Sequence, residues 1–377
     1  MQIYFYWQIF FEFQQTSIIF ARHRPTFNFC FATNTMKNTL VLTITILFCG
    51  FAGISVPRDG DFVVVSYNVE NLFDTIDNPE TADDEFTPTG ERHWDSYRYH
   101  RKLKHLWKAI AAATLTEFPD VIGFYEVENQ NVVQDLLNKT PLWWGHYSIF
   151  HRESLDRRGI DVAIAYRSET FQPIDTAAIR IKFDGSDSTY HTRDILYMKG
   201  VVKKTGDTLH IFANHWPSRY GGYAATEILR CRTASVLRQN IDSIFASNHC
   251  AKVMCIGDFN DNPDNQSVNE FLKAKTDFSD ISSGVLYNVS HYLWQKKGLW
   301  TYWYQGNGDF LDQVIASGDM LEGEGLHFSI DDVSTVAEKF LLNDDGGIFR
   351  TYLGPKYTGG FSDHLPVVVR MKAGEKK

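Results

Sequence analysis

The stretch Val253-Met-Cys-Ile-Gly-Asp-Phe-Asn260 joins an apolar run to two polar side chains, Asp258 and Asn260, across a single glycine. A short apolar run that stops at such residues is typical of a buried strand. Because a sheet holds the ends of its strands in fixed positions, side chains placed there can be aimed into a shared cleft. The stretch therefore predicts a strand whose end carries functional groups.

The same pattern of an apolar run followed by polar residues recurs along the chain. Including 252–257, it predicts strands at 62–67, 121–125, 161–166, 195–202, 209–213, 312–316 and 366–370. Apolar residues at helical spacing predict helices at Tyr99–Thr114 and Gly222–Phe245. Numerous short strands with helices between them indicate stacked sheets flanked by helices. We expect one domain over 57–377, because apolar core segments continue on both sides of each long polar stretch.

Composition allows a large core but gives no broad basic surface. The chain has 377 residues, of which 44% are hydrophobic and 15% aromatic, and its formal net charge is -9. Such a chain can bury one large core or two smaller ones. The acidic balance disfavours a wide electrostatic clamp for DNA or RNA. It does not exclude these substrates, because an active site needs only a local positive patch or a bound cation.

The first 56 residues differ in character from the rest. Met36 to Asn38 provide a short basic start, and the following stretch to Val56 contains no charged residue. This is the form of a secretory signal peptide. We therefore interpret 1–35 as a misassigned upstream extension and 36–56 as a signal peptide, which predicts export to the periplasm or the extracellular space. The alternative is a membrane anchor, because a stretch of this length can just span a bilayer.

The cysteines give no sign of a metal site or a disulfide framework. Cys231, Cys250 and Cys255 are odd in number and lack the spacing of metal ligands, so buried free thiols are the expected state. Cys49 in the leader is a poor lipidation site, because Phe48 precedes it where a lipoprotein signal has a small residue.

The predicted strand ends carry the groups that phosphoester hydrolysis requires. This reaction needs a hard cation on oxygen ligands, an oriented water and a proton donor for the leaving oxygen. The candidate residues are Asn68, Glu126, Asp161, His215, Arg219, Asp258, Asn260, Asp312, Asp363 and His364. An Asp or Asn after a strand is, by itself, more often a turn or a cap than a catalyst. The hypothesis therefore depends on the whole set.

In their order along the chain these motifs resemble the endonuclease/exonuclease/phosphatase superfamily, which includes deoxyribonuclease I. The shared pattern is Tyr67-Asn-Val69, a Glu126-Val segment, Asn214-His215, Gly257-Asp-Phe-Asn260 and Ser362-Asp-His364. The resemblance covers essentially all of the chain after the leader. One departure is Tyr125, where many members carry Gln, and it affects only a neighbour of Glu126.

The resemblance implies a fold and a metal site. The fold is α+β, a four-layer α/β/β/α sandwich of two mostly antiparallel sheets with outer helices. By the same resemblance Glu126 is the principal ligand of Mg2+ or Mn2+, and Asn68 and Asp363 help to bind the metal or its waters. Water attacks in line with the departing oxygen, and no covalent enzyme intermediate is required.

The resemblance also implies catalytic roles. His215 and His364 correspond to the two catalytic histidines of the family. Asp258 and Asn260 activate or place the attacking water and hold the phosphate, and Asp312 supports His364. A carboxylate beside a histidine stabilises the charged form of the ring.

Two further residues are weaker candidates. Asp161, in Arg158-Gly-Ile-Asp161, is the expected partner of His215. Arg219, four residues past that histidine, is a candidate for binding a substrate phosphate, and a structural role at the surface is its alternative reading.

The substrate is less well defined, because members of the family cleave DNA, RNA, sphingomyelin, inositol phosphates and nucleotide-linked phosphates. We expect a phosphoester substrate, with nucleic acid first, and lipid, inositol or other small phosphoesters as the alternative. No obligate protein partner is indicated, and membrane contact is expected only if the N-terminal apolar segment is retained. The aromatic residues before Asp312 either stack on a substrate or touch lipid, or pack between the sheets, which we favour.

Two other classes of protein fit less well. A dinuclear metallophosphatase usually has an Asp-x-His pair followed later by a Gly-Asn-His segment, and the chain has neither. A non-catalytic binding module of the same fold lacks a ligand or a histidine, whereas every family position that can be placed here holds a competent residue.

Overall fold

The computed structural model describes residues 61–115, 117–183 and 189–374 of the chain. These residues belong to one compact unit, 57–377. The predictions made for 1–35 and 36–56 lie outside the described residues. No helix within the described ranges has the length and apolar character needed to cross a membrane.

The first sheet is built around the central strands β1 and β18. Its strand order is β14-β18-β1-β2-β4-β3, and β15 also pairs with β18. Only β1 and β2 are parallel among the described pairs of this sheet, and the other neighbours are antiparallel. The strands are β1 (Phe62–Leu72), β2 (Val121–Val127), β3 (Tyr147–His151), β4 (Asp161–Arg167), β14 (Leu326–His327), β15 (Val333–Thr335) and β18 (Val367–Ala373).

The second sheet has the order β5-β6-β7-β8-β13-β10-β9. The pairs β7–β8 and β9–β10 are parallel, and the remaining described pairs are antiparallel. The strands are β5 (Phe171–Ile179), β6 (Ile195–Val202), β7 (Thr208–His215), β8 (Lys252–Asp258), β9 (Ala274–Lys275), β10 (Leu286–Asn288) and β13 (Asp312–Ser317).

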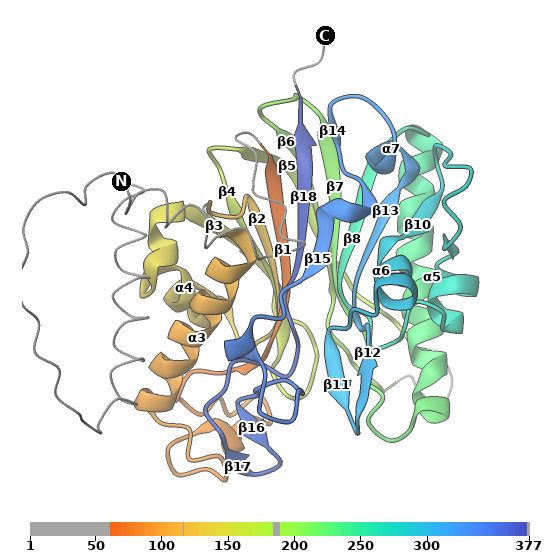
Figure 1. Cartoon of the computed structure of the whole chain (residues 1–377). Coiled ribbons are helices and arrows are strands. Elements are labelled where there is room, and N and C mark those ends of the chain that lie inside the picture. The colour runs from red at the N-terminus through yellow and green to blue at the C-terminus, as the bar shows by residue number, and fades with distance from the viewer. Residues whose placement is uncertain (1–60, 116, 184–188, 375–377) are drawn as a thin grey trace, which may run out of the picture. The chain divides into compact units, whose positions relative to one another are not determined.

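Apolar side chains from both sheets form a continuous core between them. Val64 of β1 and Ile164 of β4 belong to the same buried cluster as Met198 of β6, Ile211 of β7 and Met254 of β8. Alternate residues of a strand face opposite sides of its sheet, so each strand can fill this core with one half of its residues. The sheets therefore pack face to face, as Figure 1 shows.

Helices cover the outer faces of both sheets. Helix α3 (Ser96–Thr114) and helix α4 (Gln130–Asn138) lie against the first sheet, and α5 (Tyr223–Ser247) lies against the second (Figure 1). Leu237 and Ile241 of α5 pack on Phe212 and Val253 of the second sheet. This arrangement confirms the four-layer α/β/β/α sandwich of two mostly antiparallel sheets.

Shorter elements connect these layers. They are α6 (Val289–Lys297), α7 (Gly318–Leu321), the short helices η1 (Asp84–Phe86), η2 (Pro141–Gly145), η4 (Ser267–Phe271), η5 (Ile330–Asp332) and η6 (Lys339–Leu341), and the hairpins β11 (Tyr302–Tyr304) with β12 (Asn307–Asp309) and β16 (Tyr352–Leu353) with β17 (Lys356–Tyr357). All eight predicted strands and both predicted helices occur.

The three described cysteines are free thiols, but Cys250 is exposed, so the expectation of burial is wrong for this residue.

Candidate active site

Strand ends from both sheets meet at one edge of the sandwich. The parallel register of β7 and β8 pairs His215 with Asp258, and the antiparallel register of β8 and β13 pairs Asp258 with Asp312. In the other sheet, the parallel register of β1 and β2 places Asn68 beside the residue before Glu126. The Asn68 amide donates to Asp258 Oδ2 at 3.0 Å and so joins the two sheets at this point.

The carboxylate of Glu126 is positioned by the backbone of the neighbouring strand. Its Oε2 accepts a hydrogen bond from Asn71 N at 3.0 Å, and its Oε1 lies 3.4 Å from Asn68 Nδ2. Glu126 stands at an irregularity in the β2 register and has a φ of 65°, in the left-handed region. Bulges and backbone strain of this kind re-aim side chains and concentrate at functional sites.

The oxygen donors at this edge suit a hard divalent cation. Asp363 Oδ1 is buried and has no hydrogen-bond partner within the described part of the chain. Burial raises the pKa of Asp363, and the nearby Glu126 carboxylate adds to the rise. Neighbouring carboxylates are costly in a protein interior, and the charged His364, whose Nε2 lies 4.0 Å from Asp363 Oδ1, offsets this cost only in part. Glu126, Asp363 and Asn68 together offer the oxygen ligands that Mg2+ and Mn2+ prefer.

His364 is held in its charged form by two carboxylates. Its Nδ1 lies 2.6 Å from Asp312 Oδ2, and its Nε2 lies 3.8 Å from Asp258 Oδ2. Burial alone lowers the pKa of His364, but Asp312 and Asp258 outweigh burial and raise the pKa well above its ordinary value. Asp312 is itself fully buried, and its backbone N–H donates to Thr301 Oγ1 at 3.0 Å.

His215 is neutral, in contrast to the charged His364. Burial lowers the pKa of His215 well below its ordinary value, and the guanidinium groups of Arg193 and Arg158 add to this effect. Its Nε2 lies 3.6 Å from Asp258 Oδ2 and 3.7 Å from Glu126 Oε1. Since both neighbours of Nε2 are carboxylate oxygens, we assign the proton of the neutral ring to Nε2.

Asp258 is the common neighbour of the other groups. Asn260 reaches it twice, because its backbone N–H donates to Asp258 Oδ1 at 2.8 Å and its Nδ2 lies 3.4 Å from Asp258 Oδ2. Asn260 has a φ of 50° and also donates from Nδ2 to Trp216 O at 3.0 Å. Asp258 therefore lies between the two histidines and the amides of Asn68 and Asn260.

Asp161 occupies a different place from the one expected. Its Oδ2 lies 3.3 Å from Nε2 of His151, and its Oδ1 accepts a hydrogen bond from Ser154 N. His215 Nδ1, which was expected to meet it, has no hydrogen-bond partner among the residues described. The predicted pairing of Asp161 with His215 is therefore wrong. Asp161 begins β4, and the neighbouring strand β3 ends at His151, so the first sheet brings these two residues together.

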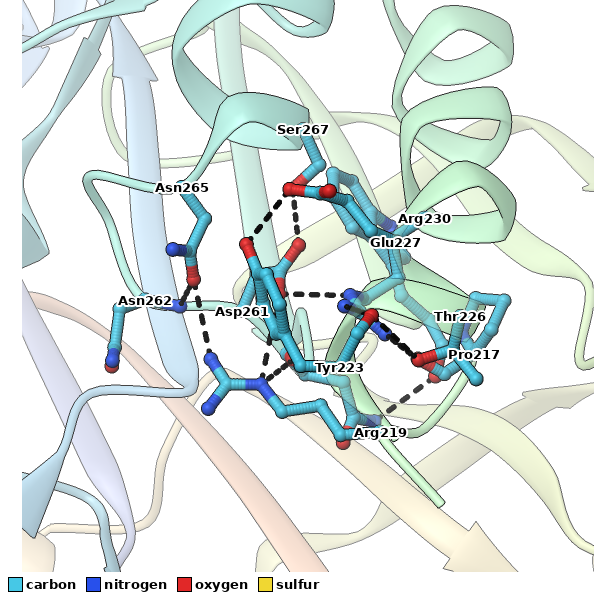
Figure 2. A network of polar contacts seen from close by, with 12 residues as sticks. Pro217, Arg219, Tyr223, Thr226, Glu227, Arg230, Asp261, Asn262, Asn265 and Ser267 are labelled. Carbon is cyan, nitrogen blue, oxygen red and sulfur yellow. Dashed lines mark hydrogen bonds and ion pairs between the residues drawn. The ribbon is translucent and has the colours of Figure 1, made fainter. Parts of the chain in front are cut away.

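Arg219 belongs to a network of polar contacts, shown in Figure 2. Its Nε donates to Asn260 O at 2.8 Å, and its terminal nitrogens lie 3.2 Å from Asp309 Oδ2 and 3.2 Å from Asn265 Oδ1. Three protein acceptors thus engage the guanidinium that was predicted to bind a substrate phosphate. This environment favours the alternative reading, in which Arg219 holds the loop that carries Asn260.

A buried ion pair lies in the same network and was not anticipated from the sequence. Arg230 Nε lies 2.8 Å from Asp261 Oδ1, and both side chains are fully buried. Ser267 Oγ donates to Asp261 Oδ2 at 2.6 Å, and Gln313 Nε2 donates to Asp261 O at 2.6 Å (Figure 2 shows the Ser267 contact). Asp261 directly follows Asn260, so this cluster fixes the backbone at the candidate site.

The aromatic residues before Asp312 meet the expectation only in part: Trp294 packs against the core between the sheets, but Tyr302, Trp303 and Tyr304 do not lie there. Tyr302 and Trp303 lie in the β11–β12 hairpin, outside both main sheets, and Tyr304 is exposed. The Tyr302 ring centroid is 4.9 Å from that of His364, and the guanidinium of Arg350 lies 5.9 Å from the Tyr302 ring. The hairpin therefore forms a wall beside His364.

The metal-free protein is expected to lose stability as the pH rises because of Asp258. Burial raises the pKa of Asp258 from 3.8 to about 7, and Asp312 adds to the rise. A carboxyl with a raised pKa contributes stability that is complete below pH 3.8 and is lost as the pH rises through its folded pKa. One such group changes the free energy of unfolding by up to about 1.4 kcal/mol per pH unit.

The measurement compares the parent with Asp258→Asn in chelator, by urea unfolding at several pH values between about 4 and 7. We expect the parent to become progressively less stable than the variant over this range. A stability difference that stays constant with pH would contradict the assignment.

Comparison with known proteins places these observations in one family. Residues 63–373 match the model of the Endonuclease/Exonuclease/phosphatase family. No curated protein is similar enough in sequence to match. The match confirms the family resemblance predicted from the motifs.

Solved structures share the fold at low sequence identity. A humanized D. rerio TDP2 matches with a TM-score of 0.52 and 16% identity, over 82% of this chain and 98% of that chain. The human Nocturnin catalytic domain matches with a TM-score of 0.50 and 17% identity, over 85% and 97%. An endonuclease/exonuclease/phosphatase from Bacteroides vulgatus matches with a TM-score of 0.51 and 13% identity, over 83% and 99%. Since the family model covers nearly all of the described residues, the chain belongs to the endonuclease/exonuclease/phosphatase family.

Proposed function

We propose that this protein is a divalent-metal-dependent phosphodiester hydrolase with a nuclease-like activity. The observation that carries the proposal is the pair of histidines with opposite charge states around one carboxylate. Neutral His215 and charged His364 both have Nε2 within 4 Å of Asp258 Oδ2, at 3.6 and 3.8 Å. Environments that push two pKa values apart in one site divide donor and acceptor roles between the groups.

The residues suggest a hydrolysis by direct attack of water. Asp258, with its pKa raised to about 7, accepts a proton from the attacking water near neutral pH. Asn260 orients the carboxylate, because it donates to both of its oxygens. His364, held by Asp312, keeps a positive charge close to the phosphate and has a proton available for the leaving oxygen.

His215 has a second role as a neutral donor. Its Nε2–H points toward the space shared by Asp258 and Glu126, where a phosphate oxygen can accept it. A neutral ring can donate this hydrogen bond without giving up its proton, so His215 stabilises charge on the phosphate throughout the reaction.

The cation belongs to the Glu126 side of the site. Glu126, Asn68 and Asp363 would hold Mg2+ or Mn2+, which supplies charge neutralisation on the phosphate when bound. The buried Asp363 Oδ1, which accepts no hydrogen bond from the described residues, supports this assignment.

Metal removal is expected to abolish hydrolysis. The purified protein is assayed on bis-p-nitrophenyl phosphate, p-nitrophenyl phosphate and plasmid DNA, with Mg2+ or Mn2+ and with excess chelator. We expect the rate to fall at least about a hundredfold in chelator, because the cation contributes several kcal/mol to the transition state, and to recover when the metal is restored. An undiminished rate in excess chelator would rule out the metal-dependent mechanism.

The same assays rank the substrates. Plasmid cleavage would support the nuclease-like activity that we propose first. Lipid, inositol or other small phosphoesters are the second candidate, and the net charge of -9 favours them, since it disfavours capture of a long polyanion. Hydrolysis of the small diester without plasmid cleavage would select this second candidate.

We also propose that the protein is exported to the periplasm or the extracellular space and needs no obligate protein partner. The support for export is the sequence of 36–56, with its basic start and uncharged continuation. Cell fractionation followed by N-terminal sequencing of the mature protein distinguishes a cleaved signal peptide from a retained membrane anchor.

A further inference from the structure

A second group of potential metal ligands lies apart from the candidate active site. It consists of His151 at the end of β3, Glu153 in the following loop and Asp161 at the start of β4. One ligand atom from each of the three residues lies within 4.8 Å of the others. We propose that these residues form a second cation site that binds Zn2+.

The buried histidine is directed toward this group without a completed hydrogen bond. The His151 side chain is 4% exposed, and its Nε2 has no hydrogen-bond partner among the described residues. Nε2 lies 3.3 Å from Asp161 Oδ2, and Asp161 is only 2% exposed. Asp161 Oδ1 already accepts a hydrogen bond from Ser154 N at 3.0 Å, so Oδ2 is the oxygen that remains for a cation.

The charges of the group favour a cation over a simple ion pair. The Glu153 and Asp161 carboxylates carry like charges and both lie close to the same histidine ring. A single histidine would have to serve both carboxylates, and its Nδ1 lies 3.8 Å from Glu153 Oε1. A divalent ion would remove the repulsion between the two carboxylates and satisfy Nε2 at the same time.

The nearby arginines already have other acidic partners. Arg193 pairs with Asp156 at 3.0 Å, and Arg180 pairs with Asp194 at 3.0 Å. Both distances are those of direct hydrogen bonds. Arg193 and Arg180 are therefore engaged by Asp156 and Asp194, and not by Glu153 or Asp161.

The ligand set indicates which cation binds. Imidazole nitrogen together with carboxylate oxygen suits Zn2+ better than Mg2+, which prefers oxygen ligands. Zn2+ needs ligand distances of about 2.0–2.2 Å, so the group must contract slightly on binding. Glu153 is 67% exposed, and its side chain is able to move inward and also leaves an entry path from solvent.

The site is separate from the catalytic one but lies on a neighbouring strand. It shares no residue with Asn68, Glu126 and Asp363. Asp161 pairs with Val127, the residue after Glu126, in the β2–β4 register. A cation here would join the end of β3 to the start of β4 and close the base of the 152–160 loop.

The test is a titration of the purified full chain with ZnCl2, followed by isothermal calorimetry. The parent is compared with Glu126→Gln, which removes the proposed catalytic ligand, and with Glu153→Gln, which alters an exposed residue and leaves the buried groups in place. Glu322→Gln, an exposed glutamate in another part of the fold, is the matched control. Circular dichroism checks that each variant is folded.

We expect Glu153→Gln to weaken one Zn2+ binding event by about tenfold or more, at least the effect of losing an outer partner of a metal ligand. The event should persist in Glu126→Gln and in Glu322→Gln and disappear in His151→Gln. Zn2+ binding that is the same in Glu153→Gln and Glu322→Gln would overturn the proposal, as would a parent whose only binding event is lost in Glu126→Gln. Because binding alone is measured, neither outcome depends on the proposed hydrolysis.

Discussion

Replacing His215 with Ala is expected to lower the turnover number by about a hundredfold to a thousandfold while the protein stays folded. The ring is a neutral donor directed between Asp258 and Glu126, and its loss removes a hydrogen bond to the charge that develops on the phosphate. Its Nδ1 has no hydrogen-bond partner among the described residues. The substitution therefore breaks no hydrogen bond at Nδ1. Steady-state hydrolysis of bis-p-nitrophenyl phosphate measures the effect.

His210→Ala is the matched control for this experiment. His210 lies on the same strand and is also buried, but its Nδ1 meets the Tyr197 hydroxyl at 2.8 Å, away from the candidate site. We expect this variant to keep most of its turnover. Equal losses in the two variants, or a loss of the folded circular dichroism spectrum in His215→Ala alone, would contradict the catalytic role.

Replacing Asp261 with Asn is expected to destabilise the protein by about 3–5 kcal/mol, the usual effect of removing one partner of a buried ion pair. Arg230 would keep its charge in a fully buried position 2.8 Å from an uncharged amide. The hydrogen bond from Ser267 Oγ, 2.6 Å in the parent, would also be weakened. Urea unfolding followed by circular dichroism gives the change in the free energy of unfolding.

The matched control is Asp242→Asn on helix α5, the helix that also carries Arg230. Arg238 and Asp242 form an ion pair of the same type at 2.6 Å, but Asp242 is 55% exposed. Exposed pairs contribute about 0–1 kcal/mol, because water screens the charges. Similar losses for the two substitutions would show that burial of the Arg230–Asp261 pair has no special importance.

The sequence predicted the elements whose pattern is local. Strands such as β8 are buried apolar runs that stop at a glycine and a polar residue, so each one is visible within a few positions. The prediction missed α4, which has only nine residues, and β5, which is largely exposed and contains Pro173. Short helices and exposed strands lack a long hydrophobic pattern, and their position depends on tertiary contacts.

Local motifs also identified most of the candidate site, but not the pairings between its residues. Asn68 meets Asp258 only because strands of different sheets end at the same edge. The sequence analysis predicts Asp161 as the partner of His215, whereas the β3–β4 pairing brings it to His151. Pairings of this kind depend on strand order and register, which a single sequence does not specify.

The sequence around the buried Arg230 already indicates that this side chain needs an acidic partner. Arg230 lies on the inner face of α5, between the buried residues Leu229 and Cys231 and one turn before Ala234. An arginine among buried helix positions requires an acidic partner. Asp261, directly after the Gly257-Asp-Phe-Asn260 motif, was the available candidate.

The place of β18 in the first sheet determines when the fold and the proposed site are completed during synthesis. This strand lies between β14 and β1, although it follows all other described strands in the chain. Asp363 and His364 immediately precede it. A nascent chain that has not yet been extended beyond residue 361 therefore lacks the strand that joins β14 and β15 to β1, together with one proposed metal ligand and one proposed catalytic histidine. The first sheet and the proposed site are completed in the same last step of translation.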